Sequence, residues 1–238
     1  MKEIHNLKQG WTFGIVCGSN VVHLNSIIDS IKNQKMNANE YEIILVGDES
    51  LLRFFEKDNI KIVHFNENIK DAWITKKKNL IAKNAKFEKI SMHHDYVALN
   101  DLWFDHFQKF GDDWDVAMTR VENADRTRFR DWVSWYEDQG ENTVQFLRYD
   151  DLSQTDKMYV SGSYFCVKKS FMLAHPFNEN LIWGQGEDVE WSKSIRDSWN
   201  YRMNFRSIVN LKKMKHKWPP NPDPYNDWYQ KVTGTNKF

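Results

Sequence analysis

The chain has 238 residues, which is enough for one large domain with a substantial core. Its 33 lysines and arginines balance 33 aspartates and glutamates, and this zero net charge disfavours a general nucleic-acid binder. Hydrophobic residues make up 41% of the sequence, which excludes an intrinsically disordered chain. No apolar run exceeds four residues, whereas a transmembrane helix needs about 20, so we expect no membrane span.

The cysteines and the N-terminus predict the cellular compartment. Cys17 and Cys166 both lie in apolar, strand-like segments, which favours buried free thiols over a disulfide and suits a reducing compartment. The N-terminus lacks the apolar segment of a signal peptide. We therefore expect a cytoplasmic protein. Peripheral association with the inner face of a membrane and the oligomeric state stay open.

The first hundred residues alternate short apolar strands with helices. The predicted elements are strands at 12–17, 41–46, 60–65 and 89–92, and helices at 24–31 and 75–86. Ser19 and Asn20 are expected to cap the first helix. This alternation predicts an α/β fold with a mostly parallel central sheet and helices on both faces.

The second half of the chain is less regular. Residues 122–156 are polar and charged with no clear strand pattern, which predicts a functional loop or a helical excursion. Four prolines predict an irregular tail from Trp218 onward. Other predicted elements are helices at 102–110 and 187–199, and strands at 116–119, 159–167 and 208–214. We expect a single domain over 1–238, with halves at 1–100 and 101–218 and a tail at 219–238.

Three polar clusters follow predicted strands, at the edge where open α/β sheets bind ligands. They are Asp48, the run of His93, His94 and Asp95, and, after the last strand, His216. A carboxylate beside imidazoles can hold a divalent metal, so Asp95 and His216 are candidate ligands. The alternative is that Asp95 caps a turn and the histidines are ordinary loop residues. Asp48 could accept a hydrogen bond from a nucleobase or cap a turn.

A fourth cluster precedes the predicted helix at 187–199. Glu187 and Asp188 follow Gly184 and Gly186 at the start of this helix. Free N–H groups at a helix N-terminus stabilise carboxylates, so the pair is either structural or contains a general base that deprotonates a hydroxyl. Trp183 offers a flat apolar face to a sugar ring, or it is a core residue.

Basic side chains gather in two further places. The helix residues 76–79, Lys-Lys-Lys-Asn, form a solvated face, or one lysine turns inward to a diphosphate. In the polar segment, Arg126, Arg128 and Arg130 could meet an anionic acceptor or a membrane surface, or stay solvated.

Taken in order, these clusters resemble the nucleotide-sugar glycosyltransferases of the GT-A fold, over roughly residues 11–218. Residues 42–50, EIILVGDES, are similar to the second strand of family 2-type enzymes, whose terminal acid binds the base. Residues 89–97, KISMHHDYV, are similar to the strand that leads to their metal-binding Asp-x-Asp. Residues 183–188, WGQGED, are similar to the Trp-Gly-x-Gly-(Gly)-Glu-Asp segment of inverting β-1,4-galactosyltransferases and polypeptide N-acetylgalactosaminyltransferases.

The resemblance implies an inverting, metal-dependent glycosyltransferase. Its donor would be a nucleotide sugar, UDP-linked with a galactose-type hexose, and its acceptor a hydroxyl of a glycan or a lipid-linked glycan in polysaccharide or lipopolysaccharide synthesis. Residues 1–100 would bind the nucleotide, and residues 101–218 would bind the acceptor and carry catalysis. Gly162 and Ser163 either line the donor-sugar site or form a simple turn before a strand.

The same resemblance assigns roles to individual residues. Asp188 would remove the acceptor proton with Glu187 beside it, while Asp95 and His216 would hold Mn²⁺ or Mg²⁺. His93 occupies the place of the first acid of Asp-x-Asp, which normally contacts the ribose; in a register shifted by one, His94 would make that contact. Further candidates are Asp48, Lys77 and Asn79 for the donor, and Trp183 and Trp132 for the acceptor. The segment 122–156, with Trp132, Trp135 and Tyr136, would shape the acceptor site.

Two other functions stay in view. The first is a non-catalytic, carbohydrate-binding module related to transferases, which the replacement of an acid by His93 favours. The second is a nucleotidyltransferase, which would need a glycine-rich, arginine-containing loop where this chain has only residues 17–20, Cys-Gly-Ser-Asn. Dehydrogenases, kinases, zinc proteases and α/β-hydrolases lose their usual support, because Gly-x-Gly-x-x-Gly, the Walker loop, His-Glu-x-x-His and Gly-x-Ser-x-Gly are all absent from the sequence.

Overall fold

The computed structural model describes residues 8–57, 59–138, 141–154 and 156–215. Predicted features from His216 onward, including the irregular tail, lie outside the described residues. The elements along the chain are β1 (Lys8–Val16), α1 (Leu24–Lys32), β2 (Tyr41–Gly47), α2 (Glu49–Leu52), the short 3-10 helix η1 (Arg53–Phe55), β3 (Ile60–His64), α3 (Ile74–Asn84), β4 (Phe87–His94), β5 (Val97–Leu99), α4 (Trp103–Phe110), β6 (Val116–Glu122), β7 (Val133–Asp138), β8 (Glu141–Phe146), β9 (Met158–Tyr159), β10 (Tyr164–Lys168), α5 (Lys169–Ala174), α6 (Glu187–Ile195) and β11 (Tyr201–Leu211).

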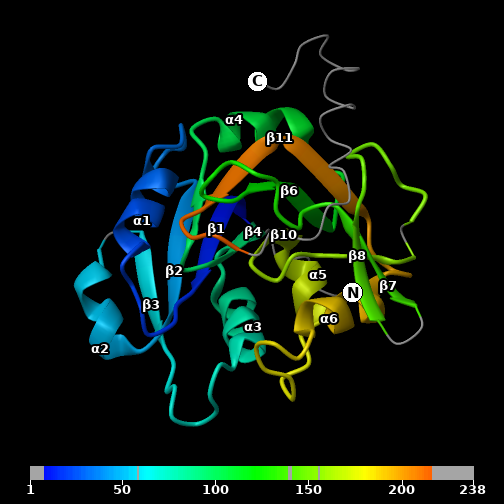
Figure 1. Ribbon diagram of the computed structural model, residues 1–238. Coiled ribbons are helices and arrows are strands. Elements are labelled where there is room, and N and C mark those ends of the chain that lie inside the picture. Colours follow the sequence, from blue (N-terminus) through cyan, green and yellow to red (C-terminus); the bar gives the residue numbers. More distant parts are fainter. Residues whose placement is uncertain (1–7, 58, 139–140, 155, 216–238) are drawn as a thin grey trace, which may run out of the picture.

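Eight strands form one curved sheet in the order β3-β2-β1-β4-β10-β6-β11-β5 (Figure 1). The neighbours β3, β2, β1 and β4 are parallel, and so are β6 and β11. β10 runs antiparallel to both β4 and β6, and β5 runs antiparallel to β11. The carboxyl ends of β1, β4, β6 and β11 therefore meet at one edge, where β10 begins. This confirms the predicted α/β fold with a mostly parallel sheet.

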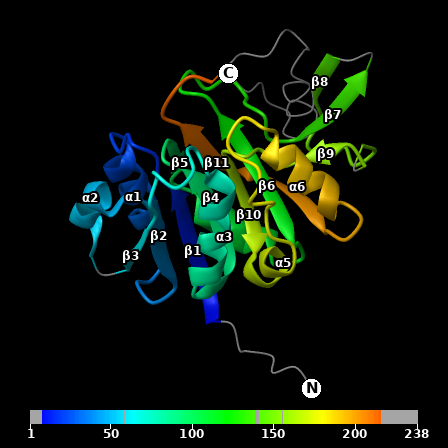
Figure 2. The same ribbon diagram turned by 90° about the horizontal axis from the view of Figure 1, so that it is seen from below.

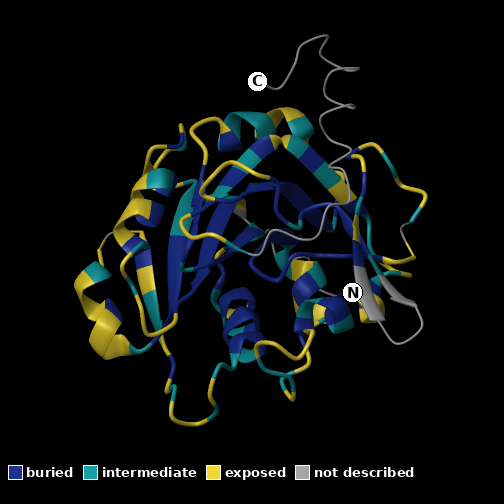
Figure 3. Ribbon diagram, viewed as in Figure 1, coloured by how far each residue is buried: buried dark blue, intermediate teal, exposed yellow. Residues whose placement is uncertain are grey.

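The central strands are buried along most of their length because helices cover both faces of the sheet (Figure 3). On one face, Trp103 of α4 packs against Trp11 of β1, with ring centroids 4.8 Å apart. On the other face α3 lies close to β1, since a Cβ at Gly14 would come within 2.2 Å of the Ile81 side chain. Figure 2 shows α3, α5 and α6 together on that face. The close approach at Gly14 brings the lysines of α3 beneath the carboxyl edge of the sheet.

The segment 122–156 differs from the prediction of a loop or helical excursion. It contains the hairpin of β7 and β8, which with β9 forms a second sheet in the order β8-β7-β9. Val133, Val144 and Tyr159 of this sheet form a small core with Val189 of α6. The strands are stabilised by this contact with a distant helix, which the polar local sequence does not reveal.

Residues 159–167 form two elements instead of the single predicted strand. β9 belongs to the second sheet and β10 to the main sheet, and residues 161–163 turn between them. The chain therefore changes sheets at a turn, and this turn lies at the carboxyl edge of β4, where His94 N–H donates to the Ser163 carbonyl (3.0 Å).

Several smaller predictions are corrected or confirmed. α1 has His23 at its N-cap and no side-chain cap; Asn20 instead accepts from the Val22 N–H (3.0 Å), so the cap prediction is wrong. α6 ends at Ile195 and β11 begins at Tyr201, earlier than the sequence indicates. Both cysteines are buried free thiols, as predicted. In the described ranges no helix has the length and hydropathy needed to cross a membrane.

Candidate functional site

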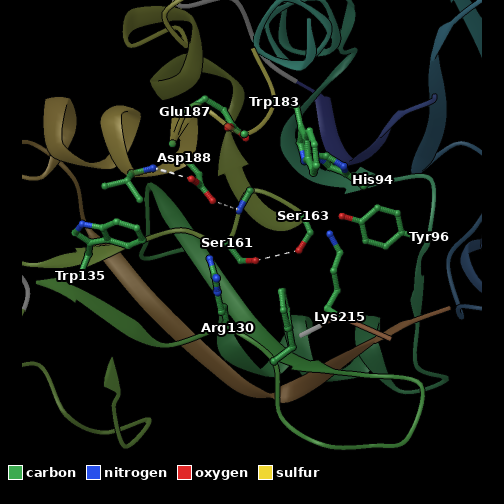
Figure 4. Close-up of a pocket in the computed structure, with 15 residues that line it drawn as sticks. His94, Tyr96, Arg130, Trp135, Ser161, Ser163, Trp183, Glu187, Asp188 and Lys215 are labelled. Carbon is green, nitrogen blue, oxygen red and sulfur yellow. Dashed lines mark hydrogen bonds between the residues drawn. The ribbon is translucent and has the colours of Figure 1, made fainter. Parts of the chain in front are cut away.

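A cleft of about 330 Å³ opens at the carboxyl edge of the main sheet (Figure 4). Its lining comes from the end of β4, the segment before β7, the turn before β10, the start of α6 and the segment after β11. These pieces are far apart in the sequence, and they meet here because parallel strands end at the same edge. The cleft therefore occupies the position where the fold favours a ligand.

Asp188 is held at this cleft by two backbone groups. Its Oδ2 accepts from the Gly162 N–H, and its Oδ1 accepts from its neighbour's Val189 N–H, both at 2.9 Å (Figure 4). Gly186, in the left-handed region with φ +70°, provides the N-cap from which α6 begins. Asp188 is thus fixed in orientation at the first turn of a helix, as predicted for the acid pair.

Gly162 lets the turn before β10 approach the acids closely. A Cβ at this position would lie 2.8 Å from Asp188 Oδ2 and 3.1 Å from Glu187 Oε1. Both distances are shorter than ordinary van der Waals contact, so a larger residue would displace at least one carboxylate. The residue that appeared in the sequence as a simple turn glycine is also part of the cleft wall.

Glu187 is buried beneath the cleft beside a buried lysine. Its side chain is 7% exposed, and its Oε1 lies 3.8 Å from Nζ of Lys78, which is fully buried. The Lys78 ammonium lies 4.7 Å from the centre of the Phe177 ring and has no hydrogen-bond partner. Burial raises the pKa of Glu187, and the Lys78 charge opposes that rise; burial lowers the pKa of Lys78. The prediction of a solvated lysine face is wrong for Lys78.

The two histidines at the end of β4 point to opposite faces of the sheet. His93 lies in the core, where its Nε2 is 2.8 Å from Ser91 Oγ and its ring packs edge-on against Tyr164. Burial lowers the pKa of His93 to about 4. The prediction that His93 contacts the donor is wrong, because its ring is fully enclosed.

His94 lines the cleft, as its predicted donor contact requires. Its Nε2 is buried and has no hydrogen-bond partner. Burial, followed by the charges of Lys78 and Lys215, holds the pKa of His94 well below its usual value. The His94 ring therefore lines the cleft while its Nε2 stays buried and without a partner.

Asp95 forms a hydrogen bond just beyond the first strand, and the described residues complete no metal site around it. Its Oδ2 accepts from the Gly18 N–H (2.7 Å) at the end of β1, and burial raises its pKa. The other predicted ligand, His216, lies outside the described residues. Among the residues that are described, no three His, Cys, Asp or Glu side chains gather in a metal-binding group. The metal site stays a prediction that this part of the chain does not complete.

The predicted donor contacts on α3 are used inside the protein. Lys77 Nζ donates to the Cys17 carbonyl (2.7 Å) and to Glu67, and Asn79 Nδ2 donates to the Phe177 carbonyl (2.9 Å). Both side chains are buried and neither lines the cleft, so these two predictions are wrong. They fail because α3 packs its polar face against neighbouring loops.

Asp48 caps α2 at some distance along the sheet edge. It accepts from both Ser50 N–H (2.8 Å) and Ser50 Oγ (2.7 Å), and these hydrogen bonds lower its pKa. The structure therefore shows the alternative in which Asp48 caps a turn. A contact between Asp48 and a nucleobase stays a prediction.

The two predicted acceptor tryptophans have different environments. Trp183 is 61% exposed and lines the cleft beside His94, as the sugar-stacking prediction requires (Figure 4). Trp132 is fully buried, its Nε1 donates to the Asp151 carbonyl (2.9 Å) and its ring packs on Tyr201. The prediction for Trp132 is wrong, and the half-buried Trp135 lines the cleft instead.

Five residues of the lining were not singled out from the sequence: Tyr96, Phe129, Ser161, Val189 and Lys215. A signal existed for Lys215, because Lys212, Lys213 and Lys215 cluster directly after the last predicted strand. Of the three arginines considered, Arg130 lines the cleft. Arg128 is buried in an ion pair with Asp131 (2.7 Å), so its predicted surface role is wrong.

Comparisons with known proteins identify the fold. No protein-family model and no curated protein sequence matches the chain. Among solved structures, TarS 1-349 of S. aureus in complex with UDP-GlcNAc has a TM-score of 0.60 at 15% identity, over 93% of this chain and 64% of that one. GalNAc-T7 with UDP, GalNAc and Mn²⁺ has a TM-score of 0.65 at 14% identity, over 90% and 45%. This chain spans less than two thirds of either structure, and the likeness shows that it has the GT-A glycosyltransferase fold.

Proposed function

We propose that this protein is an inverting glycosyltransferase. It moves a hexose from a nucleotide sugar, UDP-linked and galactose-type, to a hydroxyl of a glycan or a lipid-linked glycan in polysaccharide or lipopolysaccharide synthesis. The observation that carries the proposal is Asp188, a carboxylate oriented by two backbone N–H groups in a cleft at the carboxyl edge of the sheet. The fold and the UDP-GlcNAc and UDP complexes of its structural neighbours support a nucleotide-sugar donor.

The reaction is a single displacement. Asp188 accepts the proton of the acceptor hydroxyl as its oxygen forms a bond to the anomeric carbon of the donor. The bond from that carbon to the diphosphate breaks on the opposite face, and its electron pair leaves with the nucleoside diphosphate. Attack opposite the leaving group inverts the anomeric configuration. Trp183, exposed at the mouth of the cleft, offers its ring to the acceptor sugar.

Glu187 and Lys78 act beneath the reacting groups. Glu187 is buried next to Asp188, and the Lys78 ammonium supplies a positive charge to both acids. That charge opposes the rise that burial causes in the pKa of Glu187. Asp188, whose side chain meets the cleft, can then take the proton while Glu187 remains an internal partner of Lys78.

A divalent ion, Mn²⁺ or Mg²⁺, when bound would neutralise charge on the diphosphate. Asp95 and His216 are the ligands that the sequence predicts, and the described residues complete no such group. The proposal therefore assigns no step to the metal. A cytoplasmic location likewise stays a prediction.

The buried His93 favours a second candidate, a sugar-binding module without catalysis, because the ribose contact of the missing acid is not replaced from that position. Melting temperatures with UDP-, GDP-, CMP- and dTDP-linked sugars, each with manganese and with chelator, separate the candidates. A ligand at 100 times its dissociation constant adds about 2.7 kcal/mol of stability. Stabilisation by one nucleotide family, with release of that nucleotide in the presence of an acceptor glycan, supports the transferase. Stabilisation by free glycans alone supports the module.

A further inference from the structure

The short segment after β11 is tied to the cleft by its main chain. The Lys212 N–H donates to the Tyr96 carbonyl (2.7 Å), and the Lys215 N–H donates to Asn123 Oδ1 (3.0 Å). One bond joins the segment to the chain beyond β4, and the other joins it to the chain beyond β6. These anchors determine where the side chains of Lys213 and Lys215 lie.

Both lysines lie against the same aromatic ring. The Lys213 Nζ is 3.8 Å and the Lys215 Nζ 4.7 Å from the centre of the Tyr96 ring, which is itself buried. Each ammonium gains a cation–π contact, while the two like charges repel each other. Neither lysine forms an ion pair with any acid that the structure describes; the nearby Asp95 carboxylate accepts instead from Gly18. The pair is thus a concentrated positive charge without an ion-paired carboxylate, although the Asp95 carboxylate lies near enough to interact with the Lys213 charge.

A second, independent feature lies on the same wall. The Nε2 of His94 is buried without a hydrogen-bond partner, and the His94 ring is 5.5 Å from the Tyr96 ring. His94 is 8% exposed and lines the cleft. A buried polar atom without a partner costs free energy, and a ligand that packs against this wall could supply the missing hydrogen bond.

Apart from Arg130, which also lines the cleft, the charged groups are separated across it. Glu187 and Asp188 lie on the α6 side, and Lys215 lies beside Tyr96, with Ser161 and Ser163 between them (Figure 4). An anionic ligand is repelled by the acids and attracted to the lysines. The group of a nucleotide sugar that carries negative charge is its diphosphate, and ammonium groups bind phosphate oxygens through strong, charge-assisted hydrogen bonds.

We propose that Lys213 and Lys215, with His94 beside them, form the binding site for the diphosphate of the donor nucleotide. The inference rests on the proposed transferase function and adds to it the residues that hold the leaving group. In the displacement, negative charge builds on the diphosphate oxygen as the bond to the anomeric carbon breaks. Lysines already placed at that position stabilise the developing charge. The anomeric carbon then lies between the lysines and Asp188, as attack from the opposite face requires.

The test compares nucleotide affinities by calorimetry in the full chain. UDP, GDP, CDP and dTDP are titrated first into the wild type, and the diphosphate that binds is then compared with its nucleoside. Lys213→Met and Lys215→Met should each weaken the diphosphate about tenfold, as expected for a lost hydrogen bond to a charged group, and should leave the nucleoside unchanged. Lys215→Arg should keep most of the affinity. The matched control is Lys212→Met, an exposed side chain on the same segment.

The outcomes separate the two proposals. If the wild type binds none of the four diphosphates, the proposed function is wrong and this inference falls with it. If the wild type binds one of them and both lysine variants bind it equally well, with manganese or with chelator, only the diphosphate site is wrong. If the variants keep donor affinity but raise the KM of the acceptor, the lysines bind an anionic acceptor and the assignment to the donor is overturned. Melting temperatures equal to that of the wild type confirm that the variants fold.

Discussion

The two walls of the cleft are built in different ways. The acid wall is part of the core: Asp188 is held by backbone N–H groups, and Glu187 is buried over Lys78. The lysine wall lies on a short segment at the sheet edge, where long side chains rest on Tyr96. Proton transfer depends on hydrogen-bond geometry, whereas attraction between charges acts over several ångströms in any direction. The difference teaches that this fold fixes Asp188, the proposed base, by main-chain hydrogen bonds, whereas the side chains of the proposed phosphate-binding lysines are held by contact with one ring.

The largest expected effect is at the acid wall itself. Asp188→Asn keeps the shape and an oxygen that can accept from the Gly162 N–H, but it removes the base. Turnover should fall about 10²- to 10⁴-fold, with nucleotide affinity and melting temperature nearly unchanged. Steady-state kinetics with Glu190→Gln as the control on the same helix measure it. A loss below tenfold would remove Asp188 from the role of general base.

Lys78→Met should destabilise the folded protein and change its pH dependence. Met fills a similar volume, but Glu187 is left without its partner, and breaking a buried pair costs about 3–5 kcal/mol. Without the ammonium, the pKa of Glu187 rises further above its usual value, because burial and the neighbouring Asp188 charge then act without the opposing lysine charge. Between the usual pKa of a glutamate and this raised value, the folded state holds a proton that the unfolded state has released. The free energy of unfolding of the variant therefore falls as the pH rises through this range, and the destabilisation is smallest at lower pH.

Denaturant unfolding between pH 5 and 8 measures the Lys78→Met effect. The control is Lys76→Met on the same helix, whose ion pair with Glu179 is partly exposed and contributes at most about 1 kcal/mol. Equal stability of the two variants at pH 7 would show that the buried pair does not hold the acid wall.

Gly162→Ala tests whether close packing positions the base. The added methyl group would lie 2.8 Å from Asp188 Oδ2, so the carboxylate must move. A displacement of about 1 Å in a reacting group can cost about 10²-fold in rate. When Gly162→Ala is added to Asp188→Asn, it should lower the rate much less than it does in the wild type, because the proposed base is already absent. Additive effects of the two changes on kcat would mean that Gly162 acts elsewhere.

The smallest expected effect is at the mouth of the cleft. Trp183→Ala removes an exposed ring, so the melting temperature should not change, while the KM of the acceptor should rise about tenfold from lost stacking. Phe54→Ala, an exposed aromatic residue on η1, is the control. An unchanged acceptor KM, with a change in donor KM, would move Trp183 to the donor side.

The alternating half of the molecule was the part most readily predicted from the sequence. The strands at 12–17, 41–46 and 60–65 were located closely because strands buried on both faces are mostly apolar, and the helices at 24–31 and 75–86 were located closely as well. The hairpin of β7 and β8 was missed, because its stability comes from pairing and from contact with Val189 of α6. The composition of residues 133–146 does not indicate a contact with a helix more than forty residues further along the chain.

The residues of the candidate site also fall into two groups, those predicted from local sequence and those decided by contacts between distant segments. The acid pair and Trp183 were found from the sequence, because glycines before an acidic helix start form a local pattern whose geometry is set by a few neighbouring residues. Other features of the site were decided only in the folded chain. Trp135 rather than Trp132 lines the cleft, and Lys77 and Lys78 are buried. His93 and His94 point to opposite faces of the sheet. Which side chain meets the cleft depends on the packing of α3, β4 and the second sheet against one another, and those contacts join distant parts of the chain.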